Sequence, residues 1–120
     1  MIKRLFLTLS AFVLAVGAFM HASVFSKISS AIAKSDIASF AGSSLKVLWL
    51  ADSVTALLLA AVFGIAAARP SASSNWIIML LSMIPAATAV LIYTFVGNFI
   101  GGHIMLAAAV AAFVGGLLRP

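Results

Sequence analysis

Residues 45–67 read LKVLWLADSVTALLLAAVFGIAA, an apolar run in which Asp52 is the one acidic residue. The run is long enough to cross the hydrocarbon core of a bilayer, which requires about 20 apolar residues in a helix. A charged side chain at the centre of a membrane helix costs about 2.5 to 3.5 kcal/mol on insertion scales. The stretch therefore predicts a membrane-spanning helix and raises the question of what Asp52 does in it.

The whole chain has the composition of a membrane protein. Of its 120 residues, 65% are hydrophobic and 8% are charged, and the mean hydropathy is +1.30. Soluble domains are about half apolar and a quarter charged. We expect an all-α membrane protein of one domain (residues 1–120), an antiparallel bundle of four transmembrane helices. The expected spans are residues 5–25, 45–68, 76–96 and 100–118, with an outer loop at residues 26–44.

The first apolar run has a second interpretation as a signal peptide. Lys3 and Arg4 precede it, and small residues follow near Ala22 and Ser23, as at a signal cleavage site. Met20 is a poor residue two positions before such a cut, and the run is long enough to span. We therefore expect it to be retained as a helix.

Basic residues predict the orientation. The net charge is +5, but the seven Lys and Arg residues are spread over helix ends and loops, which indicates topology rather than a nucleic-acid surface. A cytoplasmic N-terminus places four of them inside (Lys3, Arg4, Arg69 and Arg119) and three outside (Lys27, Lys34 and Lys46). Basic residues beside the first helix usually dominate, so we expect both termini in the cytoplasm.

The connection at residues 26–44 is serine-rich and carries apolar residues near helical spacing, among them Ile28, Ile32 and Phe40. Part of it is expected to lie flat in the outer interface, and a solvated linker is the alternative. The other two connections are short. Pro70 stops the first of them, and the second, GNFIGG, is barely a turn, so the third and fourth spans are expected to be neighbours.

Small residues four apart allow close approach of membrane helices. In the last span Ala107, Ala111 and Gly115 form such a stripe, and Gly97 and Gly101 form a Gly-x-x-x-Gly pair at its start. The stripe serves packing within the bundle or a homodimer surface, and both uses stay open. Pro85 lies near the middle of the third span and predicts a kink, which in a transporter would be a hinge.

The expected topology brings polar side chains from all four spans into one outer layer: His21, Asp52, Tyr93, Asn98 and His103, with Trp49 one turn before Asp52. The favoured interpretation is a polar cap that fixes helix register, with Asp52 bound to a histidine or to Lys46. The alternatives are a proton or ligand pathway, a metal site of two histidines and one carboxylate, and a haem bound by His21 and His103. We predict no metal and no other cofactor.

The sequence offers no catalytic constellation. Serines lie mostly in loops, no carboxylates are paired, and the chain contains no cysteine, so the usual arrangements for hydrolysis or thiol chemistry are missing. We expect a protein that is not an enzyme and has no catalytic residues.

The segments GAFMH (residues 17–21) and LWLADS (residues 48–53) resemble a group of uncharacterised small four-helix bacterial inner-membrane proteins. These have a glycine and a histidine closing helix one and a tryptophan at the start of helix two. The resemblance implies a multi-pass protein of the bacterial inner (plasma) membrane and no particular activity. Small multidrug resistance transporters are similar in size, but they carry a glutamate in the first helix that this chain lacks. The glycine-rich helix and phenylalanine track of fluoride channels are also missing.

Two functions follow as hypotheses. The first is a non-enzymatic accessory or scaffold component of a membrane complex, whose partners are the lipid bilayer and either a larger assembly or a second copy of the chain. The alternative is a small transporter or proton-coupled channel that uses Asp52 with His21 and His103. No nucleic-acid partner is expected.

Overall fold

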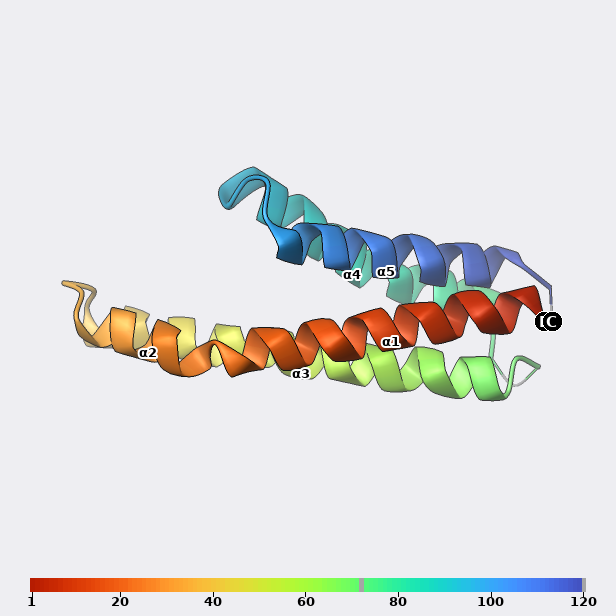
Figure 1. Cartoon of the computed structure of the whole chain (residues 1–120), viewed down its shortest axis with the longest axis horizontal. Helices are drawn as coiled ribbons and strands as arrows, with labels where there is room; N and C mark the ends of the chain where they lie inside the picture. The colour runs from red at the N-terminus through yellow and green to blue at the C-terminus, as the bar shows by residue number, and fades with distance from the viewer. Residues whose placement is uncertain (72, 120) are drawn as a thin grey trace.

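The computed structural model describes residues 1–71 and 73–119. They form five helices: α1 (Ile2–Ser23), α2 (Phe25–Ala33), α3 (Ser39–Ala68), α4 (Asn75–Phe95) and α5 (Ile100–Leu117) (Figure 1). Among them, α1 together with α2, α3, α4 and α5 give four helical stretches that are long and apolar enough to cross a membrane. The all-α class predicted from composition is therefore confirmed, and the four stretches have the length and hydropathy of the helices of a multi-pass membrane protein.

Local chemistry accounts for the helix ends. The helix α3 ends at its C-terminal cap Arg69, directly before Pro70. Proline has no backbone N–H to donate and therefore does not continue the helix. At the end of α4 the backbone of Gly97 has a φ of +89°, and its N–H donates to the carbonyl of Ile92 at 3.0 Å. Glycine adopts this left-handed conformation without steric cost, so Gly97 allows the tight turn into α5.

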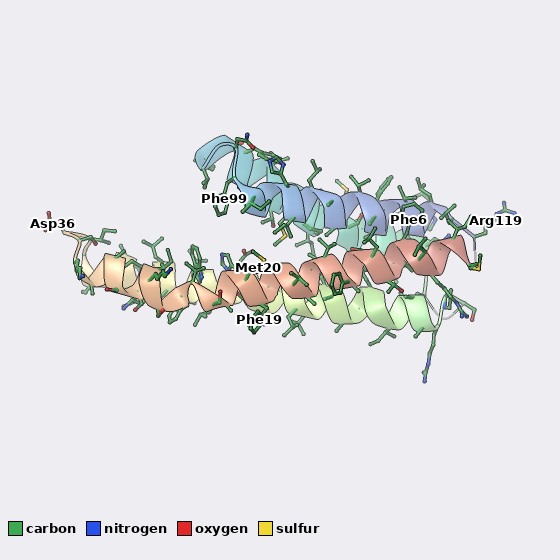
Figure 2. All side chains as sticks on the ribbon, in the orientation of Figure 1. Phe6, Phe19, Met20, Asp36, Phe99 and Arg119 are labelled. Atoms are coloured by element: carbon green, nitrogen blue, oxygen red, sulfur yellow. The ribbon has the colours of Figure 1, made fainter. Side chains whose placement is uncertain are left out.

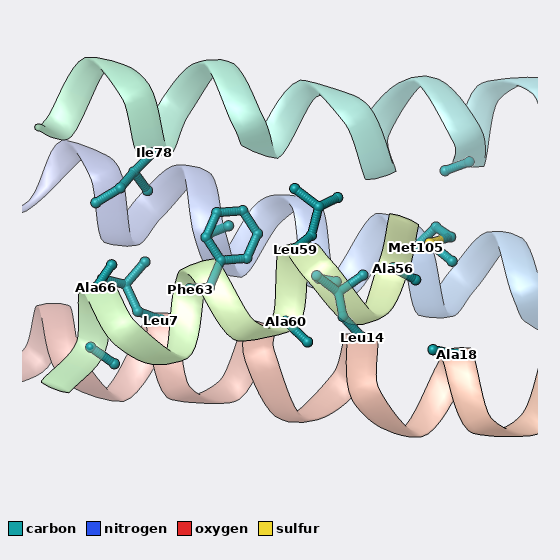
Figure 3. Packing of buried hydrophobic residues seen from close by; sticks show 14 residues of the cluster. Leu7, Leu14, Ala18, Ala56, Leu59, Ala60, Phe63, Ala66, Ile78 and Met105 are labelled. Atoms are coloured by element: carbon teal, nitrogen blue, oxygen red, sulfur yellow. The ribbon is translucent and has the colours of Figure 1, made fainter. Parts of the chain in front are cut away.

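The helices are arranged around the contact between α1 and α5. The first of these also packs along α3 and the second along α4, whereas α3 and α4 contact each other only slightly. Both chain termini lie at one end of the molecule, and the turn between α2 and α3 lies at the other (Figure 1). Buried apolar side chains from all four long helices fill the interior (Figure 3), among them Leu7, Leu14, Phe63, Ile78 and Ala112.

Small residues make the close packing of α5 possible. Ala108 and Ala112 are fully buried, and Ser10 of α1 donates a 2.8 Å hydrogen bond to the carbonyl of Ala108. A Cβ atom at Gly115 would lie 2.8 Å from Leu7 Cδ2, and one at Gly116 would lie 2.6 Å from Met79 Cγ. These contacts place α1 on one side of α5 and α4 on another.

The residues expected to pack helix against helix have different roles. Gly115 and Ala111 are buried, whereas Ala107 is exposed. No atom lies within 4 Å of a Cβ built at Gly97, and one at Gly101 would meet Phe99 and Ile92 of its own hairpin. Gly97 therefore belongs to the turn between α4 and α5, and Gly101 lies in the first turn of α5 beside Phe99 and Ile92, so the two do not form a helix-packing pair.

The segment expected as an outer loop is mostly helical. Residues 25–33 form α2, and α3 begins at Ser39, six residues before the predicted span. Ile32 lies so close to Gly42 that a Cβ there would be 2.8 Å from Ile32 Cγ2. The apolar side of α2 thus packs in part against the start of α3, although no residue of α2 is fully buried. Figure 1 shows α2 continuing the direction of α1, so this helical hairpin projects beyond the turn between α4 and α5.

A polar contact ties three helix ends together where the termini lie. Lys3 Nζ donates to Asn75 Oδ1 at 2.6 Å, and Asn75 Nδ2 donates to the carbonyl of Leu118 at 3.3 Å. The start of α1 is thereby joined to the start of α4 and to the residue that ends α5.

Candidate functional site: two histidine clusters

His21 lies near the end of α1, and three residues of α3 surround its ring. The ring stacks on Trp49 with 4.0 Å between centroids and 12° between planes. His21 Nδ1 is 2.8 Å from Ser53 Oγ, and His21 Nε2 is 3.7 Å from Asp52 Oδ2. In return, Trp49 Nε1 donates to the backbone carbonyl of His21 at 2.9 Å. We call these four residues the His21 cluster.

Helical periodicity explains why α3 can hold one ring in this way. Trp49, Asp52 and Ser53 are spaced i, i+3 and i+4, so they share one face over a single turn. The faces of the indole and the imidazole cover each other, while the hydroxyl and the carboxylate approach different ring nitrogens. These contacts hold the end of α1 against the side of α3.

The carboxylate of Asp52 interacts with His21 by charge more than by hydrogen bonding. A separation of 3.7 Å exceeds the usual hydrogen-bond distance of 2.7 to roughly 3.2 Å. The side chains remain 39% exposed for Asp52 and 27% exposed for His21. The contact is therefore an ion pair when the imidazole is protonated. Because both side chains are partly exposed, molecules outside the protein can contact them.

The hydroxyl of Ser53 has two acceptors within reach, His21 Nδ1 at 2.8 Å and the Trp49 carbonyl at 3.4 Å. When the hydroxyl donates to Nδ1, the neutral ring carries its proton on Nε2, facing Asp52. When it donates to Trp49, Nδ1–H donates to the hydroxyl oxygen and Nε2 is an acceptor. The cluster can thus accommodate either neutral tautomer.

His103 belongs to a second group of side chains, within the hairpin of α4 and α5. Its Nδ1 is 2.8 Å from the hydroxyl of Tyr93, and its Nε2 is 2.8 Å from Asn98 Oδ1. Because an amide oxygen only accepts, Nε2 donates to Asn98, and the neutral ring accepts from Tyr93 at Nδ1. Tyr93 packs on Gly102, where a Cβ would lie 2.8 Å from the tyrosine ring. We call His103, Tyr93 and Asn98 the His103 cluster.

The expected polar layer is thus divided between two pairs of helices. Trp49, His21 and Asp52 meet across α1 and α3, and Tyr93 meets His103 across α4 and α5. Within residues 1–71 and 73–119, no hydrogen bond or ion pair joins the two clusters. The same residues include no group of three histidine or acidic side chains placed to hold a metal ion.

Sequence reasoning missed several polar residues that connect helices. Ser53 directly follows Asp52 and lies one turn after Trp49, so helical spacing could have identified it. Ser10 stands alone in an apolar run, and an isolated hydroxyl there is a signal for a bond between membrane helices. Asn75 offered no comparable signal, because its bonds to Lys3 and Leu118 depend on how the helix ends meet.

An open apolar groove runs along α1 and α5 next to the His103 cluster. Its volume is about 370 Å³. The residues that line it are Phe6, Leu9, His103, Leu106, Ala107, Val110 and Ala111.

No protein-family model, no curated protein and no solved structure matches the chain.

Proposed function

We propose that this protein is a non-enzymatic accessory or scaffold subunit of a membrane complex. In this proposal its four spans form an antiparallel bundle in the bacterial inner membrane, with both termini in the cytoplasm. The observation that carries the proposal is the groove along α1 and α5, which is apolar, open and lined partly by alanine.

The groove suits a transmembrane helix of a partner subunit or of a second copy. Association of helices in lipid depends on van der Waals fit, because lipid tails are as apolar as leucine side chains. Ala107 is exposed and presents little more than the helix backbone, Ala111 lies buried beneath the groove, and larger exposed side chains such as Leu9 and Val110 lie beside them. A ridge of a partner helix can therefore approach α5 closely between these side chains.

The polar clusters support a structural role for the residues that could otherwise carry transport. In the His21 cluster every polar contact joins α1 to α3 or lies within α3. His103 bonds to side chains of its own hairpin. Contacts of this kind fix the register of neighbouring helices, and they occupy the polar groups of both clusters.

Filling the groove tests the proposal. We expect Ala107→Leu to reduce the mass of the complex extracted from native membranes to that of the single chain, measured by light scattering with a correction for bound detergent. Ala61→Leu is the matched control, because Ala61 is also an exposed helical alanine but lies on α3, and it should leave the mass unchanged. A single-chain mass for the unaltered protein, or equal masses for the two variants, would contradict the proposal.

A small transporter or proton-coupled channel is the second candidate. The observation in its favour is the partly exposed contact between His21 and Asp52, two titratable groups on different helices. The hydroxyl of Ser53, which permits either tautomer of His21, adds a means of moving a proton. The pathway expected from the sequence includes His103, but the bonds of His103 lie within the α4–α5 hairpin.

A further inference from the structure

A pocket of about 350 Å³ lies at the end of the molecule that holds the termini. It is lined by Met1, Lys3 and Arg4 at the start of α1, and by Pro70 and Ser71 in the connection after α3. Two of these five side chains carry a positive charge and none is acidic. The pocket is separate from both histidine clusters, since it shares no residue with them.

Lys3 is an unusual residue in this pocket, because only 2% of its surface is exposed. A buried charge is normally paired with an opposite charge, but the bonded partner of Lys3 is the neutral amide of Asn75. An ammonium group has three donors, and this hydrogen bond uses one. The contact with Asn75 orients the amine, and within residues 1–71 and 73–119 no carboxylate forms an ion pair with it.

The chain cannot neutralise this charge with its own side chains. Its two acidic residues are Asp36 and Asp52. The first lies at the turn between α2 and α3, at the opposite end of the molecule from Arg119 (Figure 2). The second is next to His21. The end that holds Lys3 and Arg4 therefore combines several basic residues with no carboxylate side chain.

The backbone at the start of α1 adds to the positive potential. The first N–H groups of a helix have no acceptor within the helix, and the helix dipole favours negative charge there. No acidic residue lies in the first turn of α1, and no side chain caps it. An anion in the pocket would be attracted by the side chains and by the helix terminus together.

We propose that this pocket binds the phosphate group of an anionic glycerophospholipid. Lys3 and Arg4 would neutralise the phosphate, and the hydroxyl of Ser71 would donate a hydrogen bond to one of its oxygens. The lipid is the expected source because the pocket lies at the end of membrane-spanning helices, where headgroups occur, and basic pockets between such helices bind anionic headgroups. The site requires the chain to span a membrane and is independent of the accessory role.

The test compares lipid binding to the full chain in neutral detergent, with bound lipids counted by native mass spectrometry. Phosphatidylglycerol should bind more tightly than phosphatidylcholine. Arg4→Gln should weaken phosphatidylglycerol binding roughly fivefold, because one basic residue near a lipid surface contributes about 1 kcal/mol. Arg119→Gln removes the same charge at the same end of the molecule but outside the pocket lining. It should weaken phosphatidylglycerol binding by less than half of the factor expected for Arg4→Gln. Lys3→Met should weaken binding at least as much as Arg4→Gln.

Inorganic phosphate at millimolar concentration separates the two sources of the ligand. Binding of phosphatidylglycerol that phosphate does not displace identifies the lipid as the source. Binding of phosphate that depends on Arg4, without preference for phosphatidylglycerol, supports the same site and identifies a soluble anion. Equal binding of the two lipids without phosphate binding would overturn the proposal, and so would equal effects of Arg4→Gln and Arg119→Gln. This pair of exposed arginines keeps the test decisive even when Lys3→Met does not fold.

Discussion

The position of Asp52 along the bundle accounts for an acidic residue within an apolar run. We infer that α4, with 21 residues and a length of about 31 Å at 1.5 Å per residue, matches the hydrocarbon core of roughly 30 Å. Met20, the neighbour of His21, lies near the level of Phe99 at the end of the α4–α5 hairpin (Figure 2). Asp52 then lies near the edge of the core, where the insertion cost of a charge falls.

The hydroxyl of Ser10 should make a measurable contribution to stability. Ser10→Ala removes a fully buried hydrogen bond between α1 and α5 with almost no change of volume. We expect a loss of about 0.6 kcal/mol in the free energy of unfolding, and at most roughly 1.7 kcal/mol, as for other hydrogen bonds between membrane helices. Reversible unfolding in mixed micelles measures it.

Thr94→Ala provides the comparison, since the exposed hydroxyl of Thr94 bonds to the Val90 carbonyl of its own helix and to no other helix in the described part of the chain. Its effect on the unfolding free energy should be smaller than that of Ser10→Ala. A larger effect at Thr94 would show that the bond to α5 contributes nothing specific.

Sequence reasoning identified the polar residues better than their grouping. His21, Trp49 and Asp52 were expected near one another, because the distances along two helices can be counted from their ends. Whether His103 joins them depends on the rotation of α5 about its axis and on the close approach of Tyr93 to Gly102. Counting along the sequence gives depth in the membrane and not this rotation, so one expected layer became two clusters.

Among the helices, α5 depends most on residues without side chains. A Cβ at Gly116 would lie 2.6 Å from Met79 Cγ and 3.3 Å from the Asn75 carbonyl oxygen, whereas one at Gly64 of α3 would meet only Ala11 Cβ at 3.9 Å. The two glycines therefore differ in the space available for one methyl group.

Gly116→Ala should lower the unfolding free energy, whereas Gly64→Ala should not. The first is expected to cost about 1 to 3 kcal/mol, because overpacking forces the neighbouring α4 to shift. The second is expected to be neutral or to stabilise by up to about 1 kcal/mol, the difference in helix propensity between glycine and alanine. Thermal unfolding of the purified variants measures both. Equal midpoints would mean that α4 and α5 do not pack closely at Gly116.

The number of spanning helices was predictable, whereas their ends were not. Apolar runs of spanning length identify helices directly, and four helical stretches of that kind are present. The segment at residues 26–44 was harder to interpret, because its serines suggested a loop while its apolar residues are stabilised by tertiary contact between Ile32 and Gly42. Such contacts cannot be inferred from local composition.

At the level of the whole molecule, the termini and the α2–α3 turn mark opposite ends (Figure 1). The chain contains no cysteine, so single-cysteine variants can be labelled without background. With cytoplasmic termini, Ser35→Cys at the α2–α3 turn should react with a membrane-impermeant maleimide in intact spheroplasts, and Ser74→Cys before α4 should react only after lysis. Reaction of Ser74→Cys alone in intact spheroplasts would invert the proposed topology.

The slight contact between α3 and α4 leaves α1 and α5 as the pair that holds the molecule together. The His21 cluster secures α3 to α1, and the contact of Lys3 with Asn75 secures α4 at the other end. These polar contacts join the helices at the two ends of the bundle, while the Ser10 hydroxyl and small residues join α1 to α5 between the ends. This arrangement supports the structural role proposed for Asp52.

Proton flux into liposomes distinguishes that role from transport. Purified protein would be reconstituted with a pH-sensitive dye inside the liposomes, and a potassium diffusion potential would drive proton entry. We expect the unaltered protein and Asp52→Asn to give the same flux as protein-free liposomes. A flux that the unaltered protein supports and Asp52→Asn abolishes would contradict the structural role and establish Asp52 as part of a proton pathway.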